Sequence, residues 1–213
     1  LGIHSVGDLA HYPLEKLVRF YGIMGAELYY HSHGIDMSII SEKLAYKPVN
    51  KSYGMGQTLF RDYFAEDVAQ IILEMTDEVT KRLRLGNKKA YTINLGIMYS
   101  KDTRGGFNRQ LTLTFPTNNE AEIYNSCMEL FDEFYDGSPI RKVTIRTTNL
   151  VEEYYIQLNL FKDMNKVITE HKIQSSIDNI KFRYGKNTVL RASSLLSSST
   201  VSARNKMVGG HNA

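Results

Sequence analysis

The sequence has little cysteine and no long hydrophobic run. Cys127 is the only cysteine among 213 residues, so no disulfide can form within the chain, which is usual in a reducing cytosol. No apolar stretch approaches the roughly 20 residues of a membrane-spanning helix, so we expect a cytoplasmic location and no membrane partner. The chain is 42% hydrophobic and 23% charged with a net charge of only +3, which fits one or two globular domains. The position of the charges therefore matters more than their sum.

Motifs for several kinds of chemistry are also missing. His31 and His33 have no cysteine or acidic partners in the pattern of a metal site, so a surface pair is the better interpretation. No glycine-rich loop precedes a Lys-Ser or Lys-Thr pair, and no Ser, His and Asp set can be assembled. The acidic pairs Asp77-Glu78 and Asp132-Glu133 lie in predicted helices and fit solvated faces. We predict no catalytic residue, no metal site and no cofactor in this chain.

The hydrophobic patterns divide the chain into four parts. Residues 1–36 are predicted to be helical with glycine at the joints, and residues 37–50 to be a linker. Residues 51–150 follow the βαββαβ order of a ferredoxin-like domain, with the helices on one face of a four-stranded sheet. Residues 151–213 form a basic C-terminal tail with a further helix and a Ser-rich stretch that we expect to be mobile. The predicted fold class is therefore α+β.

The second helix of the α+β domain has recognisable boundary and core signals. Thr117 and Glu120 have the spacing of a capping box at its start. On the strand before it, Phe115 continues the alternation of the core residues. The residues predicted to face the core from this helix are Tyr124, Cys127, Met128, Phe131 and Phe134.

The predicted strands place polar side chains on one face of the sheet, away from the helices. Acidic residues are scarce on this face, because they gather in the two helices. Such a surface attracts a phosphate backbone even on a nearly neutral domain. The alternative is a face that is polar only because water covers it, which explains the missing acids less well. The polar residues are Thr92, Asn94, Asn108, Gln110, Thr112, Thr114, Lys142, Thr144 and Arg146.

The first residues have the composition of a tight turn that leads into a helix. Gly2, His4, Ser5 and Gly7 are predicted to expose backbone N–H groups at a helix N-terminus, where a phosphate can bind. Ordinary helix packing also explains a turn of this kind. Leu1 is an unusual first residue, so we expect that further sequence precedes it.

A pentapeptide after the α+β domain looks like a protein-binding motif. Gln157-Leu158-Asn159-Leu160-Phe161 resembles the Gln-Leu-x-Leu-Phe peptide by which bacterial polymerases dock on the sliding clamp. Leu160 and Phe161 would fill a hydrophobic pocket while Gln157 fixes the orientation. The alternative is a strand end that packs on its own domain.

Three further stretches carry a resemblance to a known family. Leu1 to Leu9 is similar to the helix-hairpin-helix of a polymerase thumb, and Lys51 to Asp62 to the first strand of a little-finger domain. Ile177 to Gly185 resembles the tail of the same proteins. With the pentapeptide, these stretches resemble the C-terminal region of a Y-family (translesion) DNA polymerase. The likeness is strongest to the ImpB/MucB/SamB-type UV-damage repair polymerases of Gram-positive bacteria.

The resemblance implies a role in translesion DNA repair and SOS damage tolerance, close to the bacterial nucleoid. The thumb remnant and little finger would grip primer–template DNA without reading its sequence, and the tail would bind the sliding clamp. Mg²⁺ is implied for the intact polymerase, but no residue here matches its palm carboxylates, so the chain alone should not extend a primer. The predicted DNA-binding residues are Gly2, His4, Ser5, Gly7, Ser52, Gly54, Thr58, Arg61, Asn94, Gln110, Thr112, Lys142, Thr144 and Arg146.

Two other functions stay open at this point. One is a free-standing ferredoxin-like adaptor that binds protein through its sheet, and the other is an RNA-binding module of similar topology. RNA recognition by such sheets relies on exposed aromatic residues for base stacking. Tyr91 and Tyr99 share the alternation of the core residues, which disfavours the RNA-binding module.

Overall fold

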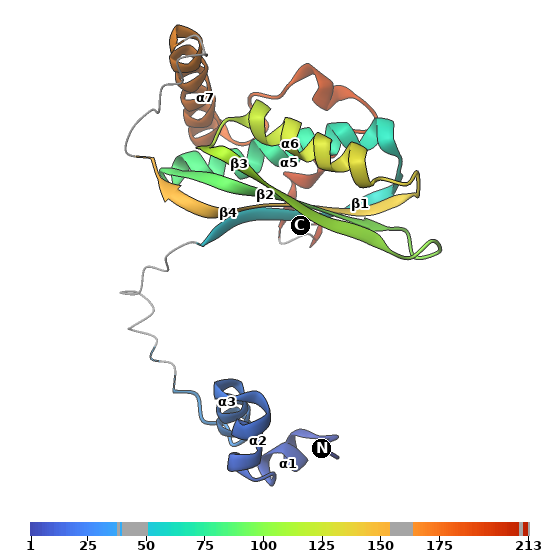
Figure 1. The fold of residues 1–213 in the computed structure, drawn as a ribbon, viewed down its shortest axis with the longest axis vertical. Helices are drawn as coiled ribbons and strands as arrows, with labels where there is room; N and C mark the ends of the chain where they lie inside the picture. Colours follow the sequence, from blue (N-terminus) through green and yellow to red (C-terminus); the bar gives the residue numbers. More distant parts are fainter. Residues whose placement is uncertain (38, 40–50, 154–163, 209–210, 213) are drawn as a thin grey trace. The chain divides into compact units, whose positions relative to one another are not determined.

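The computed structural model describes residues 1–37, 39, 51–153, 164–208 and 211–212. Its contacts divide the chain into two compact units, Leu1–Val49 and Asn50–Ala213, and each is described by itself (Figure 1). Among the helices within the described ranges, none is both long enough and apolar enough to cross a membrane.

The first unit contains the helices α1 (Val6–Ala10), α2 (Leu14–Tyr21) and α3 (Ile23–Ser32), in agreement with its predicted helical character. Gly25 lies inside α3 rather than at a break. A methyl group at this position would lie 2.2 Å from the carbonyl oxygen of Leu17. Glycine therefore allows the backbones of α2 and α3 to come into direct contact.

The second unit is built on an antiparallel sheet of β1 (Ser52–Tyr63), β2 (Lys88–Tyr99), β3 (Gly106–Thr117) and β4 (Ile140–Glu152). The strand order is β1-β4-β2-β3. Helix α5 (Ala65–Leu85) connects β1 to β2, and α6 (Glu120–Phe134) connects β3 to β4. Each helical connection skips one strand, and both helices cover the same face of the sheet (Figure 1). The predicted α+β class and its βαββαβ order are confirmed.

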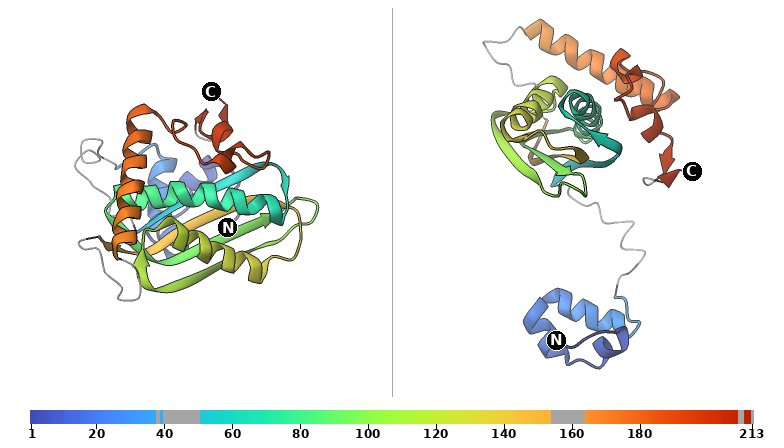
Figure 2. Two further views of the ribbon diagram at one scale, coloured as in Figure 1. Left: turned by 90° about the horizontal axis from the view of Figure 1, so that it is seen from above. Right: turned by 90° about the vertical axis from the view of Figure 1, so that its right-hand side faces the viewer.

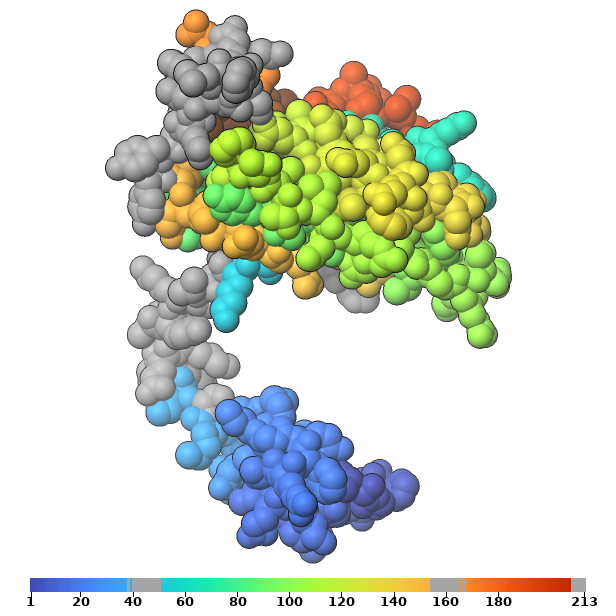
Figure 3. Space-filling model, viewed as in Figure 1, coloured from blue at the N-terminus to red at the C-terminus, as the bar shows by residue number. Residues whose placement is uncertain are grey.

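The core lies between this sheet face and the two helices. The apolar stripe of α5 is fully buried as its spacing predicts. It packs on strand residues such as Ile93, Leu95 and Ile145. At the sheet edge, the side chains of β3 and α6 meet in a continuous surface (Figure 3), where the Arg109 guanidinium lies 4.9 Å from the centre of the Phe134 ring. The buried residues of the stripe are Val68, Ile71, Ile72, Met75, Val79 and Leu83.

The buried face of α6 differs from the predicted one, because several of the buried residues stand one position before or two after the predicted ones. Ile123, Cys127, Leu130 and Phe131 are buried, whereas Tyr124, Met128 and Phe134 pack only partly against the core. The long Tyr124 and Met128 side chains reach solvent at the margin, which the spacing of apolar residues does not reveal. Burial raises the pKa of the Cys127 thiol to about 12, so an inert thiol is the correct interpretation.

Two predictions at the start of α6 were wrong. The N-cap is Asn119, whose Oδ1 accepts a hydrogen bond from the Glu122 amide (3.2 Å), and not Thr117. Phe115 is 55% exposed instead of buried. The register between β2 and β3 shifts between Ala90 and Thr92, so the alternation of β3 is interrupted in this region.

The C-terminal segment (164–208) packs on the outer side of α5 (Figure 2). It contains α7 (Met164–Tyr184), a 3₁₀ helix (Ala192–Leu195) and α8 (Val201–Arg204), and short strands β5 (Met207–Val208) and β6 (His211–Asn212) follow. The Ser-rich stretch was expected to be mobile, but Ser198, Thr200 and Val201 are buried. The amide and hydroxyl of Thr200 find a partner on α5, Glu74, which the composition alone does not show.

Candidate nucleic-acid interface

The open face is the sheet surface opposite α5 and α6, and it carries most of the predicted DNA-binding residues. The pairing register of the strands aligns the residues of this face in rows that run across the sheet. In one row, Arg146 of β4 pairs with Asn94 of β2, and Asn94 pairs with Gln110 of β3. Because side chains alternate along a strand and the residues between these are buried under the helices, this row points to the other side. Among the described residues, no helix of this unit covers the open face (Figure 1). Its rows are Ser52-Thr148-Thr92-Thr112, Gly54-Arg146-Asn94-Gln110, Gly56-Thr144-Gly96-Asn108 and Thr58-Lys142-Met98-Gly106.

The cations of the open face are available to a ligand. Its rows contain no Asp or Glu, as the sequence predicts. Within the described ranges, neither Lys142 nor Arg146 forms an ion pair. Four residues of one strand separate the two side chains by roughly 13 Å. Two positive charges therefore line up along β4, and the four rows hold no competing carboxylate; the nearest acid on β1, Asp62, pairs with Arg141 (3.6 Å).

Glycines flank the centre of the open face. Thr144 lies in register between Gly56 on β1 and Gly96 on β2. A methyl group at Gly56 would lie 3.4 Å from Thr144 Oγ1, and one at Gly96 would lie 3.4 Å from Thr144 Cβ. Glycine inside a strand weakens it, and often marks a place where a ligand or another backbone approaches closely. Sequence reasoning missed Gly56 and Gly96, although their alternation with core residues signals their position.

The other open-face residues present hydrogen-bonding groups rather than rings. Asn94 Nδ2 donates to Asn108 Oδ1 (2.6 Å), and the hydroxyl groups of Thr92 and Thr112 are 3.3 Å apart. Met98 is the large apolar side chain of the face, whereas Tyr99 is buried. The four rows therefore hold no aromatic platform of the kind on which RNA-binding sheets stack bases, and the exposed ring of Phe60 lies two residues beyond them on β1.

Arg61 does not join the other predicted DNA-binding residues. Its Nη2 donates to Asp67 Oδ2 (2.8 Å) at the start of α5, and its guanidinium lies 4.2 Å from the centre of the Tyr63 ring. Tyr63 is buried on the helix side of the sheet. The pairing of Arg61 with a nearby acid leaves Lys142 and Arg146 as the cations of the open face.

The predicted phosphate-binding turn of the first unit already holds a carboxylate. The amides of His4 and Ser5 each donate to Asp8 Oδ2 (3.0 Å), and the Asp8 amide donates to Ser5 Oγ (3.1 Å). The hydrogen bond from His4, with those from Ser5, holds the pKa of Asp8 below its usual value. Any phosphate that binds these two amides must displace Asp8.

A buried polar network joins α5 to the C-terminal segment. Thr200 is 1% exposed, and both its amide and its hydroxyl donate to Glu74 Oε2 (3.1 Å each). The same hydroxyl accepts from Gln57 Nε2 (2.8 Å), and Gln57 Oε1 accepts from Arg204 Nη1 (3.0 Å). Glu74 also accepts from Gln70 (2.9 Å). The network gives each carboxylate oxygen of Glu74 a donor, which is the condition for burying it.

Ion pairs reinforce this contact. Arg84 Nε and Nη2 donate to the Asp178 carboxylate (2.7 and 3.2 Å), and both side chains are only 8% exposed. Lys181 Nζ lies 2.7 Å from Asp77 Oδ2. The C-terminal segment is therefore fixed to α5 at several points along the helix.

A third ion pair joins the segment to α6. Arg191 Nη2 donates to both carboxylate oxygens of Glu120 (2.6 Å each). Burial raises the pKa of Glu120 and outweighs the lowering effect of Arg191.

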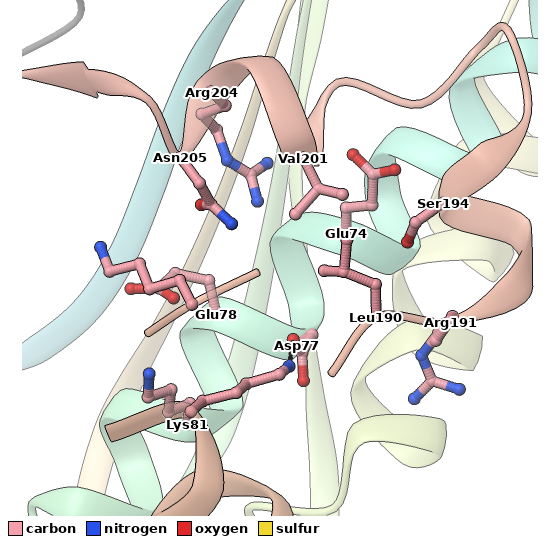
Figure 4. A pocket seen from close by; sticks show the side chains of 12 residues that line it. Glu74, Asp77, Glu78, Lys81, Leu190, Arg191, Ser194, Val201, Arg204 and Asn205 are labelled. Atoms are coloured by element: carbon pink, nitrogen blue, oxygen red, sulfur yellow. Dashed lines mark hydrogen bonds and ion pairs between the residues drawn. The ribbon is translucent and has the colours of Figure 1, made fainter. Parts of the chain in front are cut away.

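The junction between α5 and the C-terminal segment contains a small charged pocket. Figure 4 shows acidic side chains of α5, such as Glu74 and Asp77, facing cations such as Arg204. Most of these groups are satisfied by the contacts described above, so the pocket is a seam between packed elements. Within the described ranges, no group of His, Cys, Asp and Glu could hold a metal ion.

The predicted clamp-binding residues Gln157, Leu158, Leu160 and Phe161 lie outside the described residues. The structure therefore says nothing of their conformation. They remain a prediction from the sequence.

Comparison with known proteins agrees with this architecture. Residues 50–160 match the impB/mucB/samB family C-terminal domain, which covers the whole sheet and both of its helices. The chain belongs to this family and corresponds to the C-terminal region of a Y-family polymerase.

Individual relatives extend the likeness beyond the matched domain. The chain is 40% identical over 213 residues to UvrX, a candidate UV-damage repair protein of Bacillus subtilis (strain 168), covering 99% of this chain and 50% of UvrX. It is 48% identical over 139 residues to the DNA repair protein homolog YobH of the same strain, covering 64% and 63%. It is 35% identical over 212 residues to DNA polymerase IV 2 of Halalkalibacterium halodurans, covering 99% and 51%. The chain thus spans about half the length of two of these relatives.

Proposed function

We propose that this chain binds primer–template DNA without sequence preference, as the C-terminal region of an error-prone DNA polymerase that acts in DNA repair. The observation that carries the proposal is the open face, where among the described residues Lys142 and Arg146 form no ion pair and the four rows contain no Asp or Glu. The names of the relatives, which include DNA polymerase IV 2, support DNA as the partner.

Phosphate contacts position a protein on DNA but do not specify a sequence. The threonine and asparagine side chains of the open face donate hydrogen bonds that suit phosphate oxygens, while Lys142 and Arg146 neutralise charge. The glycines beside Thr144 let the DNA backbone approach the sheet closely. The open face would lie along the major groove, which is wide enough to admit strands. A surface of this kind tolerates damaged templates because it reads no base.

Salt titration of DNA binding tests this proposal. Replacing Lys142 and Arg146 together by Ala should weaken binding equally on unrelated duplexes. The slope of log K against log salt should fall by about 2, because two phosphate contacts are lost. Lys101→Ala with Arg104→Ala, on the loop between β2 and β3, is the matched control and should leave both quantities unchanged. Strong sequence discrimination, or an unaltered slope in the open-face variant, would contradict the proposal.

We propose further that Gln157–Phe161 binds the bacterial sliding clamp. Its sequence supports this, because adjacent Leu and Phe can anchor in an apolar pocket while Gln sets direction. Tethering would raise the effective concentration of the enzyme at the primer end. Replacing Leu160 and Phe161 by Ala should abolish clamp binding in titration calorimetry and leave DNA binding intact. Equal clamp affinity of the two proteins would favour a strand end packed on its own domain.

The polymerase chemistry would then belong to sequence outside this chain. Phosphoryl transfer needs metal ions clamped by carboxylates, and no motif in these residues supplies them. We expect no primer extension when the purified chain is incubated with primer–template, Mg²⁺ and deoxynucleotides. Extension that follows the chain through purification would reveal an active site within it.

A further inference from the structure

Helix α7 presents an apolar stripe that the described residues cover only in part, at Ile177. Ile173, Ile177, Ile180 and Tyr184 follow one another at intervals of four, three and four residues, which places them on one face of the helix. Ile173 is 52% exposed, Ile180 39% and Tyr184 67%. The stripe is roughly 16 Å long, which is three helical turns. A contiguous exposed apolar surface of this kind marks an interaction site.

The stripe lies on a different side of α7 from the contact with α5. Asp178 and Lys181 hold α7 to Arg84 and Asp77. Helical geometry places the stripe about 100° or more around the axis from Asp178, whereas Lys181 lies next to the half-buried Ile177. The contacts that fix α7 therefore border the stripe at Ile177 and leave Ile173, Ile180 and Tyr184 exposed.

Cations border the stripe on the side away from α5. Lys172 and Arg183 are exposed and, among the described residues, form no ion pair. The acids of the C-terminal segment are Glu170 and Asp178, and both already have partners, Asn119 and Arg84. The border of the stripe is thus positive without compensation.

We propose that the face formed by Ile173, Ile177, Ile180 and Tyr184, with Lys172 and Arg183 at its border, binds an acidic amphipathic helix of a partner protein. The helical spacing of the apolar residues matches the apolar face of another helix packed along α7. The unpaired cations select carboxylates on the partner's flank and so determine its charge.

Two other occupants fit this face less well. One alternative is a second copy of this chain, with two α7 helices packed antiparallel about a two-fold axis. In that arrangement the same side of both helices lies along the contact, so Lys172 of one copy would approach Arg183 of the other. Like charges at such a contact are destabilising. Single-stranded nucleic acid binds on aromatic platforms, and the stripe offers isoleucine over most of its length.

Two synthetic helical peptides with identical apolar residues, one with Glu and one with Lys on its flanks, test the proposal by fluorescence anisotropy. The Glu peptide should bind the full chain about tenfold more tightly than the Lys peptide. Lys172→Glu with Arg183→Glu should reverse this preference. Ile173→Ser with Ile180→Ser should weaken both peptides about tenfold. All four positions are exposed, so thermal unfolding should stay unchanged.

Lys51→Glu with Lys101→Glu makes the same change of charge elsewhere and should leave peptide binding unaltered. Equal affinity for the two peptides, or binding that survives the Ile173→Ser and Ile180→Ser changes, overturns the proposal. A dimer in sedimentation that those serine changes dissociate would assign the face to a second copy. Loss of oligo-dT binding in the Lys172→Glu and Arg183→Glu variant would assign it to nucleic acid. Either result also overturns the proposal.

Discussion

The two sides of the second unit use their cations differently. On the helix side, Arg84, Lys181 and Arg191 each hold a carboxylate of the same chain and thereby fix the C-terminal segment. On the open face, Lys142 and Arg146 have no such partner within the part of the chain that the structure describes. If the open face binds DNA as we propose, the availability of a cation, rather than the number of cations, distinguishes a binding surface from a structural contact. The net charge of the chain cannot separate the two.

The largest expected effect tests the structural role of the helix side. Arg84→Met should lower the free energy of unfolding by about 3 to 5 kcal/mol, because it leaves the buried Asp178 carboxylate without its partner. Chemical denaturation measures this change. The double variant Arg84→Met with Asp178→Leu should recover most of the loss, since it removes both charges. If the double variant is as unstable as the single one, packing rather than charge pairing explains the contact.

The next effect concerns Glu120 and depends on pH. Arg191→Met should lower the free energy of unfolding by about 2 kcal/mol at neutral pH, because the ionised Glu120 loses its charged donor. Burial already raises the pKa of Glu120 in the folded state, and removing Arg191 should raise it further. Ionisation then opposes folding, so stability is greatest below the unfolded pKa of about 4.3 and falls as pH rises through the folded pKa.

Denaturation of both proteins at several pH values checks the sign. The deficit of Arg191→Met should shrink as pH falls toward 4. A loss of unfolding free energy that is the same at every pH would mean that Arg191 stabilises the fold through packing of its aliphatic part rather than through its charge.

A third variant asks whether the open face is shaped for close approach. Gly96→Val adds a side chain next to Thr144, where a Cβ fits at 3.4 Å, and valine suits a strand. Stability should therefore hold or rise, while affinity for duplex DNA should fall about tenfold, equivalent to about 1.4 kcal/mol. The salt slope should not change, because no charge is lost. Unchanged DNA affinity would mean that Gly96 has no role in binding.

The smallest effect lies in the first unit. The hydrogen bond from the His4 amide, with those from Ser5, favours the ionised form of Asp8 and holds its folded pKa below the ordinary value. Its contribution to the stability of α1 is present above the unfolded pKa of about 3.9 and is lost as pH falls through the lower folded value. NMR titration of the two amide protons should show a midpoint below the ordinary value of an aspartate, and Asp8→Asn should abolish the transition. A midpoint near the ordinary value would mean that the turn does not hold the carboxylate.

Periodicity predicted the frame of the second unit well. The spacing of Val68, Ile72 and Met75 identified the core face of α5, and the alternation along β2 and β4 assigned the open face. Both patterns report local geometry that burial enforces along a single element. Where alternation breaks, as near Phe115 on β3, the prediction failed because a register shift has no simple sequence signature.

Contacts between distant residues could not be predicted in the same way. The burial of Thr200 depends on Glu74, which lies 126 residues earlier in the chain, so the Ser-rich composition gave the opposite answer. The occupation of the first turn by Asp8 is different, because the Ser5-x-x-Asp8 spacing is a capping signal that was present in the sequence. Arg61 illustrates a third case, in which the pairing of an arginine with an acid six residues later was not evident from the sequence.

The hydrogen bond between Gln57 and Thr200 can form only late in synthesis of the chain, after residue 200 has been added. The two residues are 143 positions apart, and translation at about 5 to 20 residues per second takes roughly 7 to 30 seconds to cover that distance. During this interval the sheet and α5 can form, while the side chains of Glu74 and Gln57 stay exposed to solvent because Thr200 has not yet been synthesised. A product that terminates before residue 200 would keep this polar seam open. Quality-control proteases could then distinguish an incomplete chain from a finished one by the side of α5 that it leaves uncovered.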